Sequence, residues 1–284
     1  MGAIEARLPC WVLTYWYEVI AIRASYLEPW ARAEENLEKR NQSWKDNEKD
    51  ETRTLIAKIY CAFSCISWCG NIRGFSIEEP IVELSKYASN QWLTDVHENQ
   101  MLELLRRKVR LQPGGQEIKI ENTYFYGFLE KGHKCHESGE YEDSRYFARA
   151  RGIGHELAAG LGSQVGFLVN TNHNHWVAVV LDFKSHVILI GDSLNPEPYR
   201  ELRTVLQWWT SHHSGHQFTE CTLDITRQQD LVSCGLLSFN ALAHHFLPST
   251  YPLTSASQVQ NGRLQVLLNV VNQHLDQVRL RHLI

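Results

Sequence analysis

The sequence predicts an α+β protein in which a sheet is flanked by helices. Three short runs rich in β-branched residues lie close together, at 165–169, 176–181 and 187–190, and polar breaks separate them. Before and after these runs, apolar residues recur at the three- and four-residue spacing of helices, for example from Met101 and from Leu202. The run at 176–181 is apolar on both faces, so we expect it to be a central strand.

The first 70 residues are predicted to be a helical extension of the domain that follows. Residues 8–27 are apolar and aromatic, which favours a buried core helix over a signal peptide, because Glu18 and Arg23 interrupt the stretch. Residues 28–53 interleave charges of both signs and predict a solvated helix or an exposed connection.

Cysteines and histidines cluster at two places where a metal site must be considered. Apolar residues return at 55–68, where thiols recur every fourth residue, which predicts small buried residues on one helical face (Cys61, Cys65 and Cys69). No histidine or fourth cysteine joins them at ligand spacing. The polar segment 131–144, with its own group of His133, Cys135 and His136, is predicted to be a loop without metal, since adjacent ligands on a short loop rarely meet one tetrahedral ion.

In the C-terminal part, Pro113 ends the helical stripe that starts at Met101. A strand is predicted at 218–225, a buried helix at 235–246 and a last helix carrying the stripe from Leu264 to Leu275. We find no internal repeats.

Length and composition fit a soluble protein with one large domain, or with a catalytic domain and an extension. The net charge is −4, so the chain has no global basic field for nucleic acid or an anionic membrane, and we expect neither partner. No uninterrupted apolar run approaches the ~20 residues of a membrane span. Seven cysteines, an odd number without a CxxC pair, argue against a disulfide scaffold and favour a reducing, intracellular location, nuclear or cytoplasmic.

Two residues at the ends of neighbouring strands could form a base and its orienting acid. His175 lies where the polar stretch 170–174 gives way to the strand from Trp176, and Asp192 follows the strand 187–190. If these strands are antiparallel neighbours, the start of one lies beside the end of the other. The carboxylate of Asp192 would then hold the His175 ring in one tautomer and stabilise its imidazolium form.

A nucleophile is expected at Cys234, which is predicted to open a buried helix. Unpaired N–H groups and the helix dipole favour a thiolate there, and a neighbouring imidazolium would lower the thiol pKa further. Gly235 leaves room for the close approach of a substrate. The side chain of Gln228 could join the Cys234 N–H as an oxyanion hole.

These residues, in this order, resemble a known signature. His175-Trp176, then Asp192-Ser193-Leu194, then Gln228-x5-Cys234-Gly235 are similar to the motifs of the ubiquitin-like-protein-specific cysteine proteases, a family that includes the SUMO (sentrin-specific) and adenovirus-type proteases. The segment Trp92-Leu93-Thr94-Asp95 resembles the family's Trp-Leu-Asn-Asp segment. The resemblance covers roughly residues 75 to 250, and Thr94, Gly191 and Ser233 depart from the family's usual residues.

The resemblance implies a papain-like fold with Cys234 as nucleophile, His175 as general base, Asp192 as orienter and Gln228 as oxyanion donor. It also implies that Trp92 and Trp176 line a tunnel for the C-terminal Gly-Gly of the substrate, with Asp95 and Gly235 beside it. The expected reaction is cleavage after the Gly-Gly of SUMO, ubiquitin or a related modifier, in deconjugation or precursor processing.

The resemblance calls for no cofactor and no metal. We expect residues 1–70 to form the extension, 71–284 the catalytic domain, and the protein to act as a monomer. Two alternatives stay open: an acetyltransferase that uses the same triad, and a catalytically silent modifier-binding module.

Overall fold

The computed structural model describes residues 11–42, 49–67, 69–194 and 199–282. The chain forms two compact units, one made of residues 1–91 together with 267–284, the other of residues 92–266. The predicted division into residues 1–70 and 71–284 stays a prediction. Among the described residues, no helix has both the length and the apolar character needed to cross a membrane.

The second unit is built on a five-stranded mixed sheet with strand order β1-β2-β3-β4-β5. The two outer pairs, β1–β2 and β4–β5, are parallel, and the central strands β2, β3 and β4 are antiparallel. The strands are β1 (Ile118–Ile120), β2 (Gln164–Thr171), β3 (His175–Asp182), β4 (Val187–Gly191) and β5 (Thr219–Thr222). Each of the predicted strands is therefore present, and β3 is central as expected.

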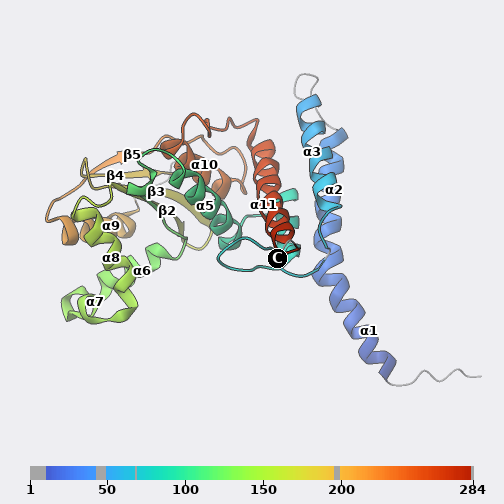
Figure 1. Cartoon of the computed structure of the whole chain (residues 1–284), viewed down its shortest axis with the longest axis horizontal. Coiled ribbons are helices and arrows are strands. Elements are labelled where there is room, and N and C mark those ends of the chain that lie inside the picture. Colours follow the sequence, from blue (N-terminus) through green and yellow to red (C-terminus); the bar gives the residue numbers. More distant parts are fainter. Residues whose placement is uncertain (1–10, 43–48, 68, 195–198, 283–284) are drawn as a thin grey trace, which may run out of the picture. The chain divides into compact units, whose positions relative to one another are not determined.

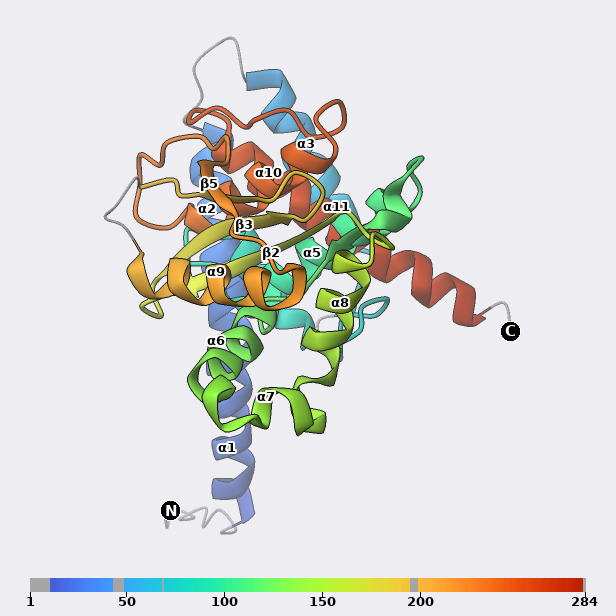
Figure 2. The same cartoon turned by 90° about the vertical axis from the view of Figure 1, so that its left-hand side faces the viewer.

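Helices cover both faces of this sheet, as Figures 1 and 2 show. One face packs against α5 and α10, and the other against α6, α8 and α9. The helices of this unit are α5 (Asp95–Arg110), α6 (Phe125–Cys135), α7 (Glu140–Asp143), α8 (Ala148–Ala158), α9 (Arg200–Ser214), α10 (Cys234–Phe246) and the first part of α11 (Val259–His282). Helices around a mixed sheet confirm the predicted α+β class.

Alternation along the strands decides which residues meet which helix layer. Phe167 of β2 and Val179 of β3 belong to the apolar cluster with α6, α8 and α9, centred on Trp209. On the opposite face, a Cβ added to Gly166 would touch the side chains of Leu242 and Phe246, so α10 packs directly on the backbone of β2. This close approach fixes the height of α10 above the sheet and thus the position of its first residue.

A tight hairpin connects β2 to β3 and defines where β3 begins. Asn172 and His173 both have positive φ, 54° and 59°, as in the hairpin turns that match strand twist. Thr171 pairs with His175 across the turn, and the Thr171 hydroxyl donates to the His175 carbonyl at 3.1 Å. His175, the first residue of β3, is therefore held in place at the end of this central strand.

The first unit is helical. Its elements are α1 (Trp11–Ile22), a π-helical turn η1 (Arg23–Leu27), α2 (Glu28–Gln42), α3 (Lys49–Phe63), a 3₁₀ turn η2 (Ile81–Glu83), α4 (Leu84–Ala88) and the later part of α11. Asn36 of α2 donates to the Ala88 carbonyl of α4 at 2.7 Å, and Trp30 packs edge-on against Phe63 of α3. The charged stretch 28–53 thus forms two helices that bury one face, including Leu37.

Three sequence expectations are wrong. The helix at 8–27 is not a core helix, because its large side chains are exposed, among them Tyr17 at 74% and Trp16 at 58%; residues 8–10 lie outside the described part of the chain. Cys61, Cys65 and Cys69 are exposed rather than buried. Segment 131–144 is mostly helical, since α6 continues to residue 135 and α7 follows. Local composition indicates only a tendency towards burial or towards a loop. Whether a segment is buried depends on the elements that pack against it in the folded chain.

Candidate active site

The site lies where the start of β3 meets the end of β4 and the start of α10. The register of β3 on β4 pairs Ala178 with Gly191, so the chain leaving β4 passes beside the residues that open β3. Asp192 is the first residue after β4, and its Oδ1 accepts from Nε2 of His175 at 2.8 Å. The predicted antiparallel geometry brings these two side chains together.

Cys234 is the first residue of α10, and its thiol lies close enough to the ring of His175 for the two groups to shift each other's pKa. Because Nε2 of the ring is bound to Asp192, the nitrogen left for the sulfur is Nδ1. Two further donors point at the sulfur: the backbone N–H of Trp176 and the indole Nε1 of Trp92, which lies 3.1 Å from Sγ.

The electrostatics favour a thiolate–imidazolium pair. Burial raises the pKa of Cys234, but the hydrogen bonds from His175, from the Trp176 backbone and from Trp92 outweigh it, so the pKa lies below its usual value. For His175, burial lowers the pKa, yet its bonds to Asp192 and Cys234 raise it to about 9. An imidazole with a pKa of about 9 beside a thiol of lowered pKa favours transfer of the thiol proton to the ring.

Asp192 is held from several sides. Burial raises its pKa, while hydrogen bonds from His175, from the Tyr199 hydroxyl and from the Leu194 N–H lower it, and the net pKa falls. The hydroxyl of Tyr199 donates to Oδ2, so both carboxylate oxygens are occupied. An aspartate ionised and fixed in this way can orient the imidazole.

Gln228 lies next to this group, though its amide is engaged elsewhere. Its Oε1 accepts from the buried Ser193 hydroxyl at 3.0 Å, and its Nε2 donates to the Asp230 carbonyl at 2.7 Å. Asp230 also accepts from the N–H and the hydroxyl of Ser233, the residue before the nucleophile. This network fixes the loop that leads into α10 and presents the start of the helix.

The two predicted tunnel residues pack on each other near the sulfur. The rings of Trp92 and Trp176 have their centroids 6.3 Å apart. Trp176 is buried and donates to the Leu93 carbonyl at 3.1 Å, whereas Trp92 is partly exposed. Cys234 is only 1% exposed, and the indole of Trp92 is one of the groups in contact with Sγ.

The other two predicted substrate-binding residues, Asp95 and Gly235, each lie in the first turn of a helix. Asp95 opens α5, whose N-terminus is capped by Thr94 and His97, and it accepts from the Tyr124 hydroxyl at 2.7 Å. Gly235 follows the nucleophile, with no free space at its Cα for a side chain.

Sequence reasoning missed Tyr199, Ser193 as a partner of Gln228, and Asp230. Ser193 belongs to the Asp192-Ser193-Leu194 motif, which does not reveal its partner. Asp230 could have been suspected, because an aspartate three residues before a helix N-cap often accepts hydrogen bonds from the turn that follows. For Tyr199 no signal exists, since its contact with Asp192 depends on the path of the intervening chain.

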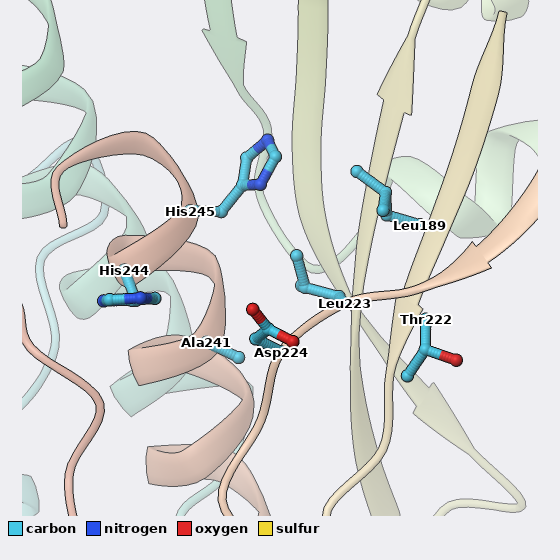
Figure 3. Close-up of a pocket in the computed structure, with 7 residues that line it drawn as sticks. All are labelled: Leu189, Thr222, Leu223, Asp224, Ala241, His244 and His245. Carbon is cyan, nitrogen blue, oxygen red and sulfur yellow. The ribbon is translucent and has the colours of Figure 1, made fainter.

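Apart from this site, a hollow of about 110 Å³ lies between β4, the segment after β5, and α10. Figure 3 shows the seven residues that line it, with Asp224 and Leu223 between the helix and the sheet. It contains none of the predicted site residues. Among the described residues, no group of three or more His, Cys, Asp or Glu side chains is arranged to hold a metal ion.

No protein-family model and no curated protein sequence matches the chain. Solved structures do. The C-terminal Ulp1 protease domain in complex with Smt3, the yeast orthologue of SUMO, aligns with a TM-score of 0.55 at 18% identity, over 82% of this chain and 99% of that one. The SUMO protease Ulp1 with its catalytic cysteine oxidised to a sulfonic acid aligns with a TM-score of 0.57 at 18% identity, over 82% and 98%.

A third structure, the Ulp1-like SUMO protease catalytic domain of Chaetomium thermophilum, aligns with a TM-score of 0.56 at 13% identity, over 78% of this chain and 89% of that one. At these identities the likeness concerns the fold. The chain therefore has the α+β fold of the Ulp1-type, ubiquitin-like-protein-specific cysteine protease domains, as its sequence motifs predicted.

Proposed function

We propose that this protein is a cysteine peptidase that cleaves after the C-terminal Gly-Gly of a ubiquitin-like modifier, with Cys234 as nucleophile, His175 as general base and acid, and Asp192 as the residue that orients His175. The observation that carries the proposal is the convergence of three elements: Cys234 opens α10, and His175 at the start of β3 is held at 2.8 Å by Asp192 after β4. The lowered pKa of Cys234, to which His175 contributes, agrees with it. The fold shared with SUMO proteases supports it.

In the proposed reaction, the Cys234 thiolate attacks the carbonyl carbon of the terminal glycine. The N–H of Cys234 and one N–H of Gln228, released from Asp230, stabilise the oxyanion. The imidazolium of His175 then gives its proton to the leaving amine, and a thioester remains. Water, deprotonated by His175, hydrolyses the thioester and regenerates the thiol. No step requires a metal or cofactor.

Two indole rings near the sulfur support a Gly-Gly substrate. Flat aromatic walls leave space for an extended backbone and exclude side chains. In the proposal Trp92 turns away from Sγ to become the outer wall of this channel and Trp176 remains the inner one, while Asp95 and Gly235 border it. The catalytic domain is proposed to comprise residues 71–284, after the helical extension 1–70.

The decisive experiment is a panel of electrophilic probes, each a ubiquitin-like protein (SUMO, ubiquitin or a Nedd-type modifier) with a reactive group at its C-terminus. We expect one of them to form a covalent adduct with the wild type and none with Cys234→Ala, and the reactive probe identifies the modifier. If no probe labels Cys234 in the folded protein, the peptidase proposal is wrong and a silent modifier-binding module becomes the better explanation.

An acetyltransferase with the same triad is the other alternative. Incubation with radiolabelled acetyl-CoA separates the two, because a peptidase should acquire no label at Cys234. Label retained on wild type and lost in Cys234→Ala would favour the transferase.

A further inference from the structure

A buried carboxyl that the proposed mechanism does not use lies beside the nucleophile. Glu98, on α5, has no solvent exposure, and neither of its carboxylate oxygens has a hydrogen-bond partner among the described residues. Burying an ionised carboxylate without partners is very costly, so such a group is rare in a native structure unless it is neutral or has a role.

Glu98 lies directly against the start of α10. A Cβ placed on Gly235 would come within 2.1 Å of Oε1 of Glu98 and 3.2 Å of the Trp176 ring. Gly235 is the residue that follows Cys234, so the carboxyl touches the backbone that carries the nucleophile. This contact also explains why position 235 has space only for glycine.

The charges that face Glu98 come from two helices. Cys234 of α10 is one, and the buried Arg263 of α11 is the other, while β3 contributes the uncharged Trp176. Burial, and next the negative charge of Cys234, raise the pKa of Glu98 well above its ordinary value, and Arg263 only partly offsets them. Its surroundings therefore favour the protonated form of this carboxyl.

We propose that Glu98 is a positioning residue for Cys234, a carboxyl that permits the thiolate while it is protonated and opposes the thiolate when it ionises. This inference rests on the proposed role of Cys234 as nucleophile. The interaction of two charges is mutual, so a thiolate that disfavours the Glu98 anion is itself disfavoured by that anion.

The protons and charges of Glu98 and Cys234 can be followed through both changes. When Glu98 ionises, its proton goes to solvent, and the negative charge left behind faces both Arg263 and the sulfur. When the sulfur is acylated or alkylated, its negative charge disappears. Glu98 then has only Arg263 opposite, and its pKa should fall. Acylation of Cys234 and ionisation of Glu98 are thus coupled, whereas the free thiolate and the Glu98 anion disfavour each other.

The test measures the rate at which iodoacetamide alkylates Cys234 in the full chain, from about pH 5 to pH 10, by mass spectrometry of the peptide that contains it. In the wild type we expect the thiolate to form over a broad pH range, because Glu98 and Cys234 are coupled and release their protons in overlapping steps. In Glu98→Gln, which keeps the volume but cannot ionise, we expect a single, sharper step with its midpoint at lower pH, because no carboxylate then opposes the thiolate. Superimposable profiles would overturn the proposal.

A matched control is Glu103→Gln, about one and a half turns further along α5, where the carboxylate is largely buried but pairs with Arg107. Its alkylation profile should follow that of the wild type. If the midpoint of its profile moves to lower pH as well, a general effect of charge on α5 would replace the specific role of Glu98.

A second measurement keeps the inference testable if Glu98→Gln does not fold. In wild-type protein labelled with ¹³C at glutamate carboxyls, one resonance should keep the chemical shift of a protonated carboxyl at neutral pH and should move when Cys234 is alkylated. If every glutamate titrates normally, the proposal fails. Neither measurement uses a ubiquitin-like substrate, so its outcome is independent of the probe panel that tests the function.

Discussion

Nε2 of His175 lies 2.8 Å from Oδ1 of Asp192, although 17 residues separate the two along the chain. The antiparallel pairing of β3 and β4 creates this contact, because it places the first residue of one strand beside the residue that follows the other. The same contact is part of the reason that the pKa of His175 reaches about 9. It therefore sets the pH range in which the proposed enzyme works.

The first prediction concerns Asp192→Asn. The wild type should show a bell-shaped dependence of kcat/KM on pH, with an alkaline limb near pH 9 where His175 loses its proton. Without the carboxylate, the pKa of His175 falls, so the alkaline limb should move to lower pH. The rate should also drop by roughly 10²–10⁴-fold, since the ring is no longer oriented or stabilised as imidazolium.

The measurement is the pH profile of cleavage of the modifier precursor identified by the probe panel. Asp143→Asn, an exposed aspartate on α7, is the matched control and should leave the profile unchanged. An Asp192→Asn variant with a wild-type alkaline limb would show that Asp192 does not act on His175.

The second prediction concerns Tyr199→Phe. The hydroxyl of Tyr199 donates to Oδ2 of Asp192, so its removal leaves one carboxylate oxygen without this donor. We expect kcat to fall about tenfold, as for the loss of a hydrogen bond to a charged group, with KM little changed. Steady-state kinetics check this against Tyr146→Phe, whose hydroxyl contacts Lys131 outside the site. Equal values of kcat in the two variants would show that the Tyr199 hydroxyl does not contribute to catalysis.

The third prediction concerns Gln228→Ala. An oxyanion donor contributes about 3–4 kcal/mol to the transition state, so kcat should fall on the order of a hundredfold or more while the modifier still binds. Single-turnover rates and binding of the modifier to a Cys234→Ala background separate the two effects. A normal rate would mean that Gln228 only supports the loop through Ser193 and Asp230.

The fourth prediction concerns stability in acid. Burial, together with the charges of His212, His155 and Arg151, lowers the pKa of His213 to about 3, and its Nε2 is bonded to the Tyr141 hydroxyl. The unfolded chain takes up this proton below about pH 6.5, and the folded chain does not. The contribution of His213 to the free energy of unfolding is therefore fully present above pH 6.5 and is lost as the pH falls towards 3. At pH 5 this loss amounts to up to about 2 kcal/mol.

Thermal unfolding at pH 7 and pH 5 measures this loss. His213→Gln should show a smaller decrease in Tm between the two pH values than the wild type, although its Tm at pH 7 is lower. His173→Gln, at the exposed hairpin turn, serves as control. If the Tm of His213→Gln and that of the wild type decrease equally between pH 7 and pH 5, another group causes the acid sensitivity.

Much of the second unit could be predicted because its strands are short, rich in β-branched residues and set apart by polar turns. The order of β2, β3 and β4, and the start of α10 at Cys234, follow from that local pattern. The motifs around His175, Asp192 and Cys234 then indicated which strand ends must meet, and the structure brings these three side chains together.

What could not be predicted depends on contacts between distant segments. The apolar residues of α1, such as Trp16, suggested burial, yet local composition does not say whether another element covers a helix. The same limit hid Tyr199 and Glu98, which matter through what they touch. A glutamate in a charged-looking turn of α5 is ordinary in sequence, and only its position against Gly235 makes it notable.

The indole N–H of Trp92 that points at Sγ of Cys234 also gives the protein an optical signal. Indole emission responds to a nearby electron-rich sulfur and to the polarity around the ring, so the fluorescence of Trp92 should change whenever the sulfur is protonated, oxidised or acylated. Subtracting the spectrum of Trp92→Phe removes the background of the other eight tryptophans. Formation and decay of a thioester could then be followed in real time by stopped-flow fluorescence, with an unmodified substrate and no attached dye.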